Sequence, residues 1–418
     1  MIVVSNKFYS FLALLLVFLS LLGFQLANTV MLPLVSSIVN QSQTVSYFYR
    51  GVVFVVSFIL IVATPSEKKN PLDRKATIIY LVFMLIYFTR ILIDIFINDI
   101  YILPGFRPTI LQYIFIAMIP SIWATSRCAR YIDYERLNRW LMWGGVLLLV
   151  ATVLNQNTLI AIEYDETIRA KGGGGEGTIS FGHTCVSIFI IFMSWLACHK
   201  NGKQLWNTVL VLLMLLSFVI MLRAGSRGPL VTFVVVILFI LFSRIKNKIL
   251  GLIISFIIIS VVWVNMTTII EWLGNLSPMM EERMAATMYE DDSSGRDLLY
   301  KDAINIFLQN PIFGKQFLLN SGTYSHNSIL DIMIGLGFGG VLVWIYLIWK
   351  DVKLTYHHVF NKTSLMIIGL LSVQFISKGF LSGAMYLDNG LAVCMVIILS
   401  ITTDDDEEDD YVEDDYKD

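Results

Sequence analysis

The sequence is poor in charge and in proline. Only 15% of its 418 residues are Asp, Glu, Lys or Arg, and only nine are prolines, whereas 56% are hydrophobic. Soluble domains carry about 25% charged residues. This shortage excludes an ordinary soluble domain, and we expect no nucleic-acid partner. A mean hydropathy of +0.71 instead indicates a polytopic membrane protein, with the lipid bilayer as its first partner.

Two further patterns are missing. The four cysteines lie in or beside apolar runs without CxxC spacing, so neither a zinc site nor a disulfide framework is indicated. The chain also lacks the alternating apolar and polar residues of a transmembrane strand, so the predicted fold is an all-α helix bundle. We interpret residues 8–24 as a retained first helix rather than a signal peptide, because no small-residue cleavage site follows them.

Long apolar runs are abundant. A helix needs about 20 apolar residues to cross the hydrocarbon core. The sequence predicts about twelve such spans, in one membrane domain over residues 1–403. Their expected positions are 8–28, 45–64, 77–98, 109–126, 139–158, 179–198, 205–222, 228–243, 249–268, 327–349, 363–381 and 385–402.

The distribution of Lys and Arg predicts the orientation of these spans. With the N-terminus inside, the five cytoplasmic loops (67–75, 127–139, 199–203, 244–248 and 350–362) hold 16 of these residues. The short outer loops around 29–44, 99–108 and 382–384 hold only Arg107. By the positive-inside rule, both termini are cytoplasmic. The acidic segment 404–418 is then a solvated, disordered tail.

One stretch breaks this rule. Segment 221–232, MLRAGSRGPLVT, places Arg223 and Arg227 between spans seven and eight, on the predicted outer side. Span eight is short, so the hairpin tip should lie below the membrane surface. An arginine near the bilayer centre costs about 2.5–3.5 kcal/mol, and less toward the edge. We therefore expect a bound anion or a water-filled cavity to compensate these two cations.

Other cations lie at a similar height. Arg50, Arg90, Arg169 and Arg296 are all predicted near the outer face. Snorkelling or loop solvation is the alternative for such residues, and Arg90 could instead pair with Asp94, one helical turn later. Guanidinium groups bind phosphate bidentately without risk of deprotonation. Several of them around one outer cavity would suit a diphosphate ligand.

Only two of the five histidines reach the predicted outer face, namely His183 and His326. A histidine titrates near pH 6.5, so His326 is a candidate general base. The alternative is that it is an interfacial or helix-capping residue. Tyr324 and Asn327 beside it, together with Arg50, Arg169 and His183, are candidates for substrate binding.

The large outer loop, about 269–326, is predicted to be partly helical. Ser294 and Asp297 fit a capping box, and Asn310-Pro311 would end the helix. An apolar stripe at helical spacing predicts that this helix packs over the bundle as a lid, with Arg296 in its first turn; the stripe is Leu299, Ala303, Ile306 and Phe307. The acidic run 290–292 raises a metal site as an alternative, but a charge run before a cap is usually solvated, and we predict no metal and no cofactor.

Three segments resemble the O-antigen polymerase and O-antigen ligase (Wzy/WaaL-type) superfamily of membrane glycosyltransferases. SRGPLVT (226–232) is similar to its S-R-G stretch at the outer end of a span. SGRDLLYKDAINIFLQNPIFGK (294–315) is similar to its outer-loop helix, and YSHNSILDIMIGLGFGG (324–340) to its H-N-x-x-L start of a late span. Together they cover about the C-terminal half, in the expected order.

The resemblance implies transfer of an undecaprenyl-diphosphate-linked glycan on the periplasmic face of the bacterial inner membrane, without metal. By motif, Arg227 and Arg296 would hold the donor diphosphate, and His326 would deprotonate the acceptor hydroxyl. Arg223 and Arg90 are our additions to the diphosphate set, from their positions. A chain-length regulator would be a further partner.

A polymerase uses lipid-linked oligosaccharides as both donor and acceptor, whereas a ligase uses lipid A–core as acceptor. Only 14 residues separate Pro311 from His326, and 377–391 resembles a serine-rich turn of polymerases, so we favour a polymerase. A lipid-linked oligosaccharide flippase is the alternative from another class, although we find no internal repeat of the kind transporters often show. A structural scaffold would leave the buried cations unexplained.

Overall fold

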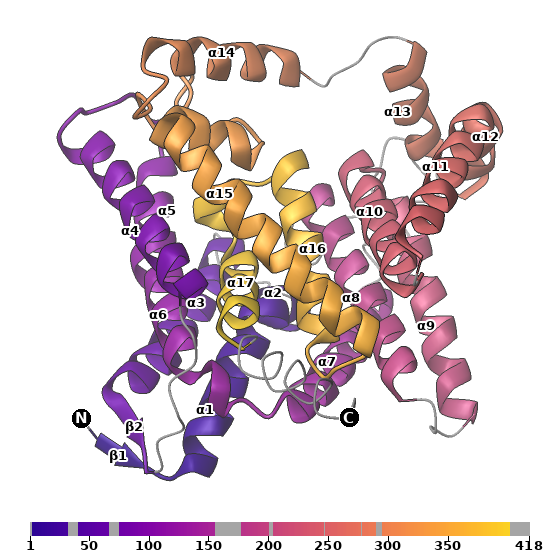
Figure 1. Ribbon diagram of the computed structural model, residues 1–418, viewed down its shortest axis with the longest axis horizontal. Coiled ribbons are helices and arrows are strands. Elements are labelled where there is room, and N and C mark those ends of the chain that lie inside the picture. Colours follow the sequence, from indigo (N-terminus) through magenta and orange to yellow (C-terminus); the bar gives the residue numbers. More distant parts are fainter. Residues whose placement is uncertain are drawn as a thin grey trace, which may run out of the picture.

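The computed structural model describes residues 2–31, 41–66, 75–154, 177–199, 204–245, 247–276, 278–289 and 295–401. In these ranges the chain forms a helical bundle (Figure 1). The one exception is a pair of three-residue parallel strands, β1 (Ile2–Val4) and β2 (Ala63–Pro65), at the end of the bundle opposite α14. The predicted polytopic helical architecture is confirmed.

The N-terminal half supplies six predicted spans. Its elements are α1 (Asn6–Phe18) and α2 (Phe24–Met31), joined by the π-helical η1 (Leu19–Gly23); α3 (Gln41–Val62); α4 (Lys75–Phe96); α5 (Phe106–Gln112) and α6 (Ile119–Cys128), joined by the π-helical η3 (Tyr113–Met118); the short η4 (Ala129–Tyr131); α7 (Tyr134–Leu154); and α8 (Thr178–Cys198).

The C-terminal half supplies the other six. Its elements are α9 (Gln204–Arg223), α10 (Arg227–Arg244), α11 (Lys248–Val264), α12 (Met266–Leu276), α13 (Pro278–Tyr289), α14 (Arg296–Gln309), α15 (Ser328–Asn361), α16 (Met366–Leu381), η8 (Met385–Leu387) and α17 (Asn389–Ile401).

Every predicted span coincides with a helix or a joined pair of helices. Among the described residues, nine helices are long and apolar enough to cross a membrane, and α16 and α17 are shorter apolar helices. Those two are buried on nearly all sides, with α16 packed against α8, α10, α15 and α17. An all-round apolar helix belongs in the centre of a bundle. The total of twelve spans stays a prediction.

Three predicted boundaries are wrong. The fifth span begins at Tyr134 rather than 139. Residues 350–361 are not a loop, because α15 continues through them to Asn361 and is capped by Lys362, which has a φ of 55°. The last helix begins at Asn389 rather than 385, because the Asp388 carboxylate accepts the Leu391 N–H at 3.1 Å and so caps the helix start.

Helix α15 is interrupted at Gly337, where φ is 68°. The segment after α14 occupies this break: Phe338 N donates to the Pro311 carbonyl at 2.8 Å, and Lys315 N donates to the Ile334 carbonyl at 2.7 Å. A Cβ on Gly337 would lie 2.3 Å from the Ile312 carbonyl oxygen, so only glycine fits. The break thereby joins the outer loop to the membrane bundle.

Helix α14 lies across one end of the bundle, at the top of Figure 1. Its Ala303 and Ile306 pack against Leu319 and Ile334, with Leu299 and Phe307 at the edge of that cluster, as the apolar stripe predicted. The helix also ends at Asn310 as predicted. Its start differs, because the N-cap is Gly295, with a φ of 74° and no side-chain cap, while Ser294 lies outside the described residues.

Candidate functional site

The tip between α9 and α10 is a tight turn covered by protein. Ala224 is fully buried and Ser226 is 3% exposed. Ala224 N donates to the Ile220 carbonyl at 3.1 Å, and Gly225, with a φ of 58°, continues the turn. Arg223 ends one helix and Arg227 begins the next. Both arginines are therefore held at the edge of a buried turn rather than on a free loop.

This tip packs against the start of α8. A Cβ on Gly182 would meet the Pro229 ring at 2.6 Å, and a Cβ on Gly228 would lie 3.7 Å from His183 Nε2. Close approach at these two glycines places the imidazole of His183 beside the first turn of α10. Arg227 is the residue that immediately precedes Gly228.

His183 is 3% exposed and is held by the helices around it. Its carbonyl accepts a hydrogen bond from Gln374 Nε2 at 2.7 Å, and Gln374 Oε1 accepts one from Ser187 at 2.9 Å. The ring Nε2 lies 3.4 Å from the Ser382 hydroxyl. The ring Nδ1 is buried and has no hydrogen-bond partner in the described part of the chain.

Ser382 connects the two outer histidines. It follows α16, so its hydroxyl faces His183 while its backbone forms a hydrogen bond with the His326 ring. The His326 ring also contacts Tyr324, with 4.3 Å between ring centroids. One residue at the end of α16 thus brings together side chains 143 positions apart, from α8 and from the start of α15.

The surroundings of His326 favour its neutral form. Partial burial lowers the pKa of its imidazole below the usual 6.5; the hydrogen bond to the Ser382 backbone acts in the opposite direction, and the Arg296 cation lowers the pKa further. A lowered pKa leaves the ring uncharged at neutral pH. His326 is therefore able to accept a proton there.

Arg296 is the first residue of α14 and is partly exposed. Its charge acts on His326, so the lid helix brings a cation to the histidine. On the other side, Arg223 has a buried Nε that makes no hydrogen bond within the described ranges. One cation thus acts electrostatically on His326, and two others lie at the α9–α10 tip.

Two other predicted arginines are engaged elsewhere. Arg90 Nε forms an ion pair with Asp94 at 2.9 Å, which fits the structural alternative. Arg50 is 7% exposed, donates to Gln112 at 3.1 Å and lies 3.9 Å over the Tyr113 ring. The Arg50 contacts join α3 to α5 and η3, whereas the Arg90 pair lies within α4. Arg169 lies outside the described residues.

The Asn327 side chain caps the start of α15. Its side-chain oxygen accepts from Ile329 N and Leu330 N at the start of α15, and its amide nitrogen donates to the Phe380 carbonyl at 3.1 Å. Tyr324, in contrast, is partly exposed and packs between His326 and Phe106. Of these two neighbours, Tyr324 is the one placed to meet a substrate.

The sequence assigned no role to Ser382, Gln374 or Lys378. Lys378 lies one turn before Ser382 and forms an ion pair with Asp388 at 2.9 Å. The available signal was the polar segment 377–391, which interrupts two apolar spans. The residues that this segment contacts could not be predicted from the sequence, because they lie on α8 and at the start of α15.

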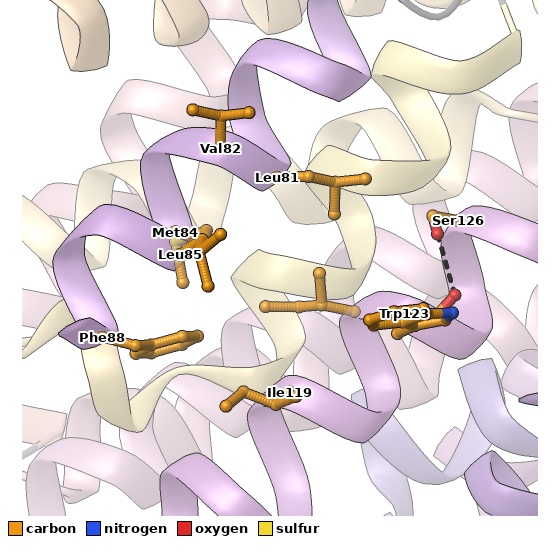
Figure 2. Close-up of a pocket in the computed structure, with 9 residues that line it drawn as sticks. Leu81, Val82, Met84, Leu85, Phe88, Ile119, Trp123 and Ser126 are labelled. Atoms are coloured by element: carbon orange, nitrogen blue, oxygen red, sulfur yellow. Dashed lines mark hydrogen bonds between the residues drawn. The ribbon is translucent and has the colours of Figure 1, made fainter. Parts of the chain in front are cut away.

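An open apolar groove lies elsewhere on the bundle, between α4 and α6, with a volume of about 310 Å³ (Figure 2). Leu81, Leu85 and Phe88 line one side of it and Trp123 the other. A second apolar groove of about 410 Å³ lies on the other side of α4, against α15. Their linings are almost wholly apolar, so neither groove supplies groups for acid–base chemistry or for holding a diphosphate.

Residues 212–345 match the family model described as O-antigen ligase (Wzy_C). The match includes all three segments that carry the resemblance seen in the sequence. The chain is a membrane glycosyltransferase that uses a lipid-linked glycan donor. Polymerases and ligases share this family model. No curated protein and no solved structure matches the chain.

Proposed function

We propose that the protein is a polymerase that joins undecaprenyl-diphosphate-linked oligosaccharide repeat units on the periplasmic face of the bacterial inner membrane. The observation that carries this proposal is the position of the His326 ring, which forms a hydrogen bond with the Ser382 backbone and whose pKa is lowered by partial burial and by the Arg296 cation. The tip that carries Arg223 and Arg227 lies on the far side of Ser382, beside His183. A general base with cations around it is what glycosyl transfer from a lipid diphosphate requires.

In the proposed reaction, an acceptor sugar hydroxyl attacks the anomeric carbon of the donor glycan while its proton passes to His326. A glycosidic bond forms and the bond from sugar to diphosphate breaks. Undecaprenyl diphosphate leaves with the bonding electrons. Arg227 and Arg296, supported by Arg223, neutralise that leaving group, so the mechanism needs no metal ion.

The compact outer segment before His326 supports a polymerase over a ligase. The segment is bound to its surroundings at Lys315 by the α15 break and at Asn320, where Asp302 of α14 accepts the backbone N–H at 3.0 Å. A segment held this closely leaves little chain for cradling a bulky lipid A–core acceptor. Ligase activity is the second candidate, because the matching family model bears that description.

Deletion of the gene tests the proposal through the surface glycan. Loss of polymer, with single repeats still attached to lipid A–core, is expected for a polymerase. Polymer that accumulates on undecaprenyl diphosphate would instead indicate a ligase. Purified protein in vesicles with lipid-linked repeat units should yield a ladder of longer lipid-linked glycans. A change in the sidedness of the repeat units alone would indicate a flippase and overturn the proposal.

A further inference from the structure

His326 has a backbone conformation that L-residues avoid. Its φ is 61°, and among the described residues only Asp99 and Lys362 are other non-glycine residues with positive φ. The left-handed conformation is unfavourable because Cβ approaches the following carbonyl oxygen. Such a conformation persists only where surrounding contacts hold it. The contacts on both sides of His326 therefore decide where its imidazole lies.

A buried carboxylate provides the strongest of these contacts. Asp331, which is 0% exposed, accepts hydrogen bonds through Oδ1 from Ser325 N at 2.9 Å and from Ser325 Oγ at 2.7 Å. The same hydroxyl lies 2.9 Å from the Asn327 carbonyl and 3.2 Å from Asn327 N. Asp331 thereby fixes the residue before His326 and, through Ser325, the residue after it.

The far side of the turn is held by α16. Asn327 donates to the Phe380 carbonyl, and a Cβ on Gly379 would lie 3.1 Å from Ser328 Oγ, so the start of α15 sits closely on the end of α16. Ser382, the partner of the His326 ring, follows two residues after Phe380. A shift of residues 325–327 would therefore separate the His326 ring from Ser382.

We propose that Asp331 is the positioning residue for His326, and that its carboxylate maintains the left-handed turn that aims the imidazole at the acceptor hydroxyl. This inference rests on the proposed function, in which His326 is the base. Asp331 itself touches neither the ring nor the substrate. Its role is exerted through Ser325, so its removal should affect turnover more than substrate affinity.

Asp351 offers a matched control on the same helix. It is also 0% exposed and also accepts a hydrogen bond from a serine, Ser372 Oγ, at 2.9 Å. It lies 20 positions after Asp331 on α15, toward the opposite end of that helix. Substitution of Asp351 removes an equivalent buried carboxylate without touching the His326 turn.

The experiment measures chain extension by the full-length protein in vesicles, with purified lipid-linked repeat units. Asp331→Ala should lower kcat by about 100-fold, which is what a misplacement of about 1 Å costs a catalytic group. KM should change little. Asp331→Asn retains an oxygen that accepts both Ser325 bonds, and should keep kcat within about fivefold of the parent, because neutral bonds are about half as strong as charge-assisted ones.

Ser325→Ala distinguishes the contributions of the two hydrogen bonds to Asp331, because it deletes the hydroxyl and leaves the Ser325 N–H. Its kcat should fall between those of Asp331→Asn and Asp331→Ala. Asp351→Ala should leave kcat near the parent value in whatever fraction of protein folds. Each value is normalised to folded, membrane-inserted protein, so a loss of folding in any variant is scored separately from turnover.

Three results would overturn the inference: an Asp331→Ala enzyme with parental kcat, an Asp331→Asn enzyme as impaired as Asp331→Ala, or an Asp351→Ala enzyme equally impaired in kcat. The proposed function fails in a different way. If His326→Ala extends chains normally, His326 is not the base. If His326→Ala is inactive while Asp331→Ala is normal, the positioning role alone is wrong.

Discussion

Two arginine environments, on α4 and at the end of α9, differ in how the guanidinium is satisfied. Arg90 on α4 is paired with the buried Asp94, whose carboxylate also accepts Asn98 Nδ2 at 2.7 Å and Phe317 N at 2.9 Å. Arg223 at the end of α9 has a buried Nε without a hydrogen-bond partner in the described ranges. We propose that Arg90 is a structural cation, whereas Arg223 is available to an anion.

The difference follows from the contacts that each of these two regions makes. On the α4 side, the Asp94 pair anchors the segment that follows α14. On the α9–α10 side, the buried tip packs beside His183, whose ring lies 3.4 Å from the Ser382 hydroxyl. We propose that the first region stabilises the segment after α14 and that the second offers charge to a ligand. Four experiments test this contrast, in order of decreasing effect.

The largest effect is expected at His326. His326→Ala removes the proposed base and should lower chain extension by about 10²–10⁴-fold, the usual contribution of general base catalysis. The measurement is the ladder of lipid-linked products, with membrane insertion checked by the amount of purified protein. Full-length polymer from this variant would remove His326 from the mechanism.

Arg227→Lys tests the tip. A lysine keeps the charge but not the bidentate geometry, so chain extension should fall, by about 10²-fold if phosphate contacts there resemble those of an oxyanion hole. Arg90→Lys is the matched control, because Asp94 can still pair with an ammonium group. Equal losses in the two variants would contradict the contrast between the two regions.

Asp94→Ala should affect stability rather than turnover. It leaves the buried Phe317 N–H without its acceptor, which costs about 1–3 kcal/mol. A lower midpoint of thermal unfolding is expected, with kcat per folded molecule near the parent value. If kcat falls instead while the midpoint stays constant, the α4 region belongs to the chemistry.

The smallest effect is a shift in pH dependence. A base works in its neutral form, so activity should fall as the pH drops through the pKa of His326, which burial and Arg296 together lower below 6.5. Arg296→Gln removes the cation, so the pKa of His326 should rise and the acidic limb of the activity profile should move to higher pH. A limb that moves the other way, or stays in place, would exclude Arg296 as the group acting on His326.

The sequence predicted the helices well because spans depend on local properties. Apolar length and helical rise determine where a helix can cross, so helices such as α9 and α10 lie within two residues of their expected positions. The lid helix was also readable, because Ala303 and Ile306 repeat at helical spacing. The break at Gly337 was not, since a glycine-rich run permits close helix approach and interruption equally well.

For the candidate site, too, the sequence predicted the residues but not their contacts. Residue order along the chain was enough to predict arginines in an apolar setting near the span ends, together with two histidines, His183 and His326. Their partners follow from helix packing: Asp94 for Arg90, Ser382 for both histidines, and Asp331 for the turn at His326. The physical reason is that span length and charge placement are properties of one segment, whereas a hydrogen bond between α16 and the start of α15 depends on how separate helices pack.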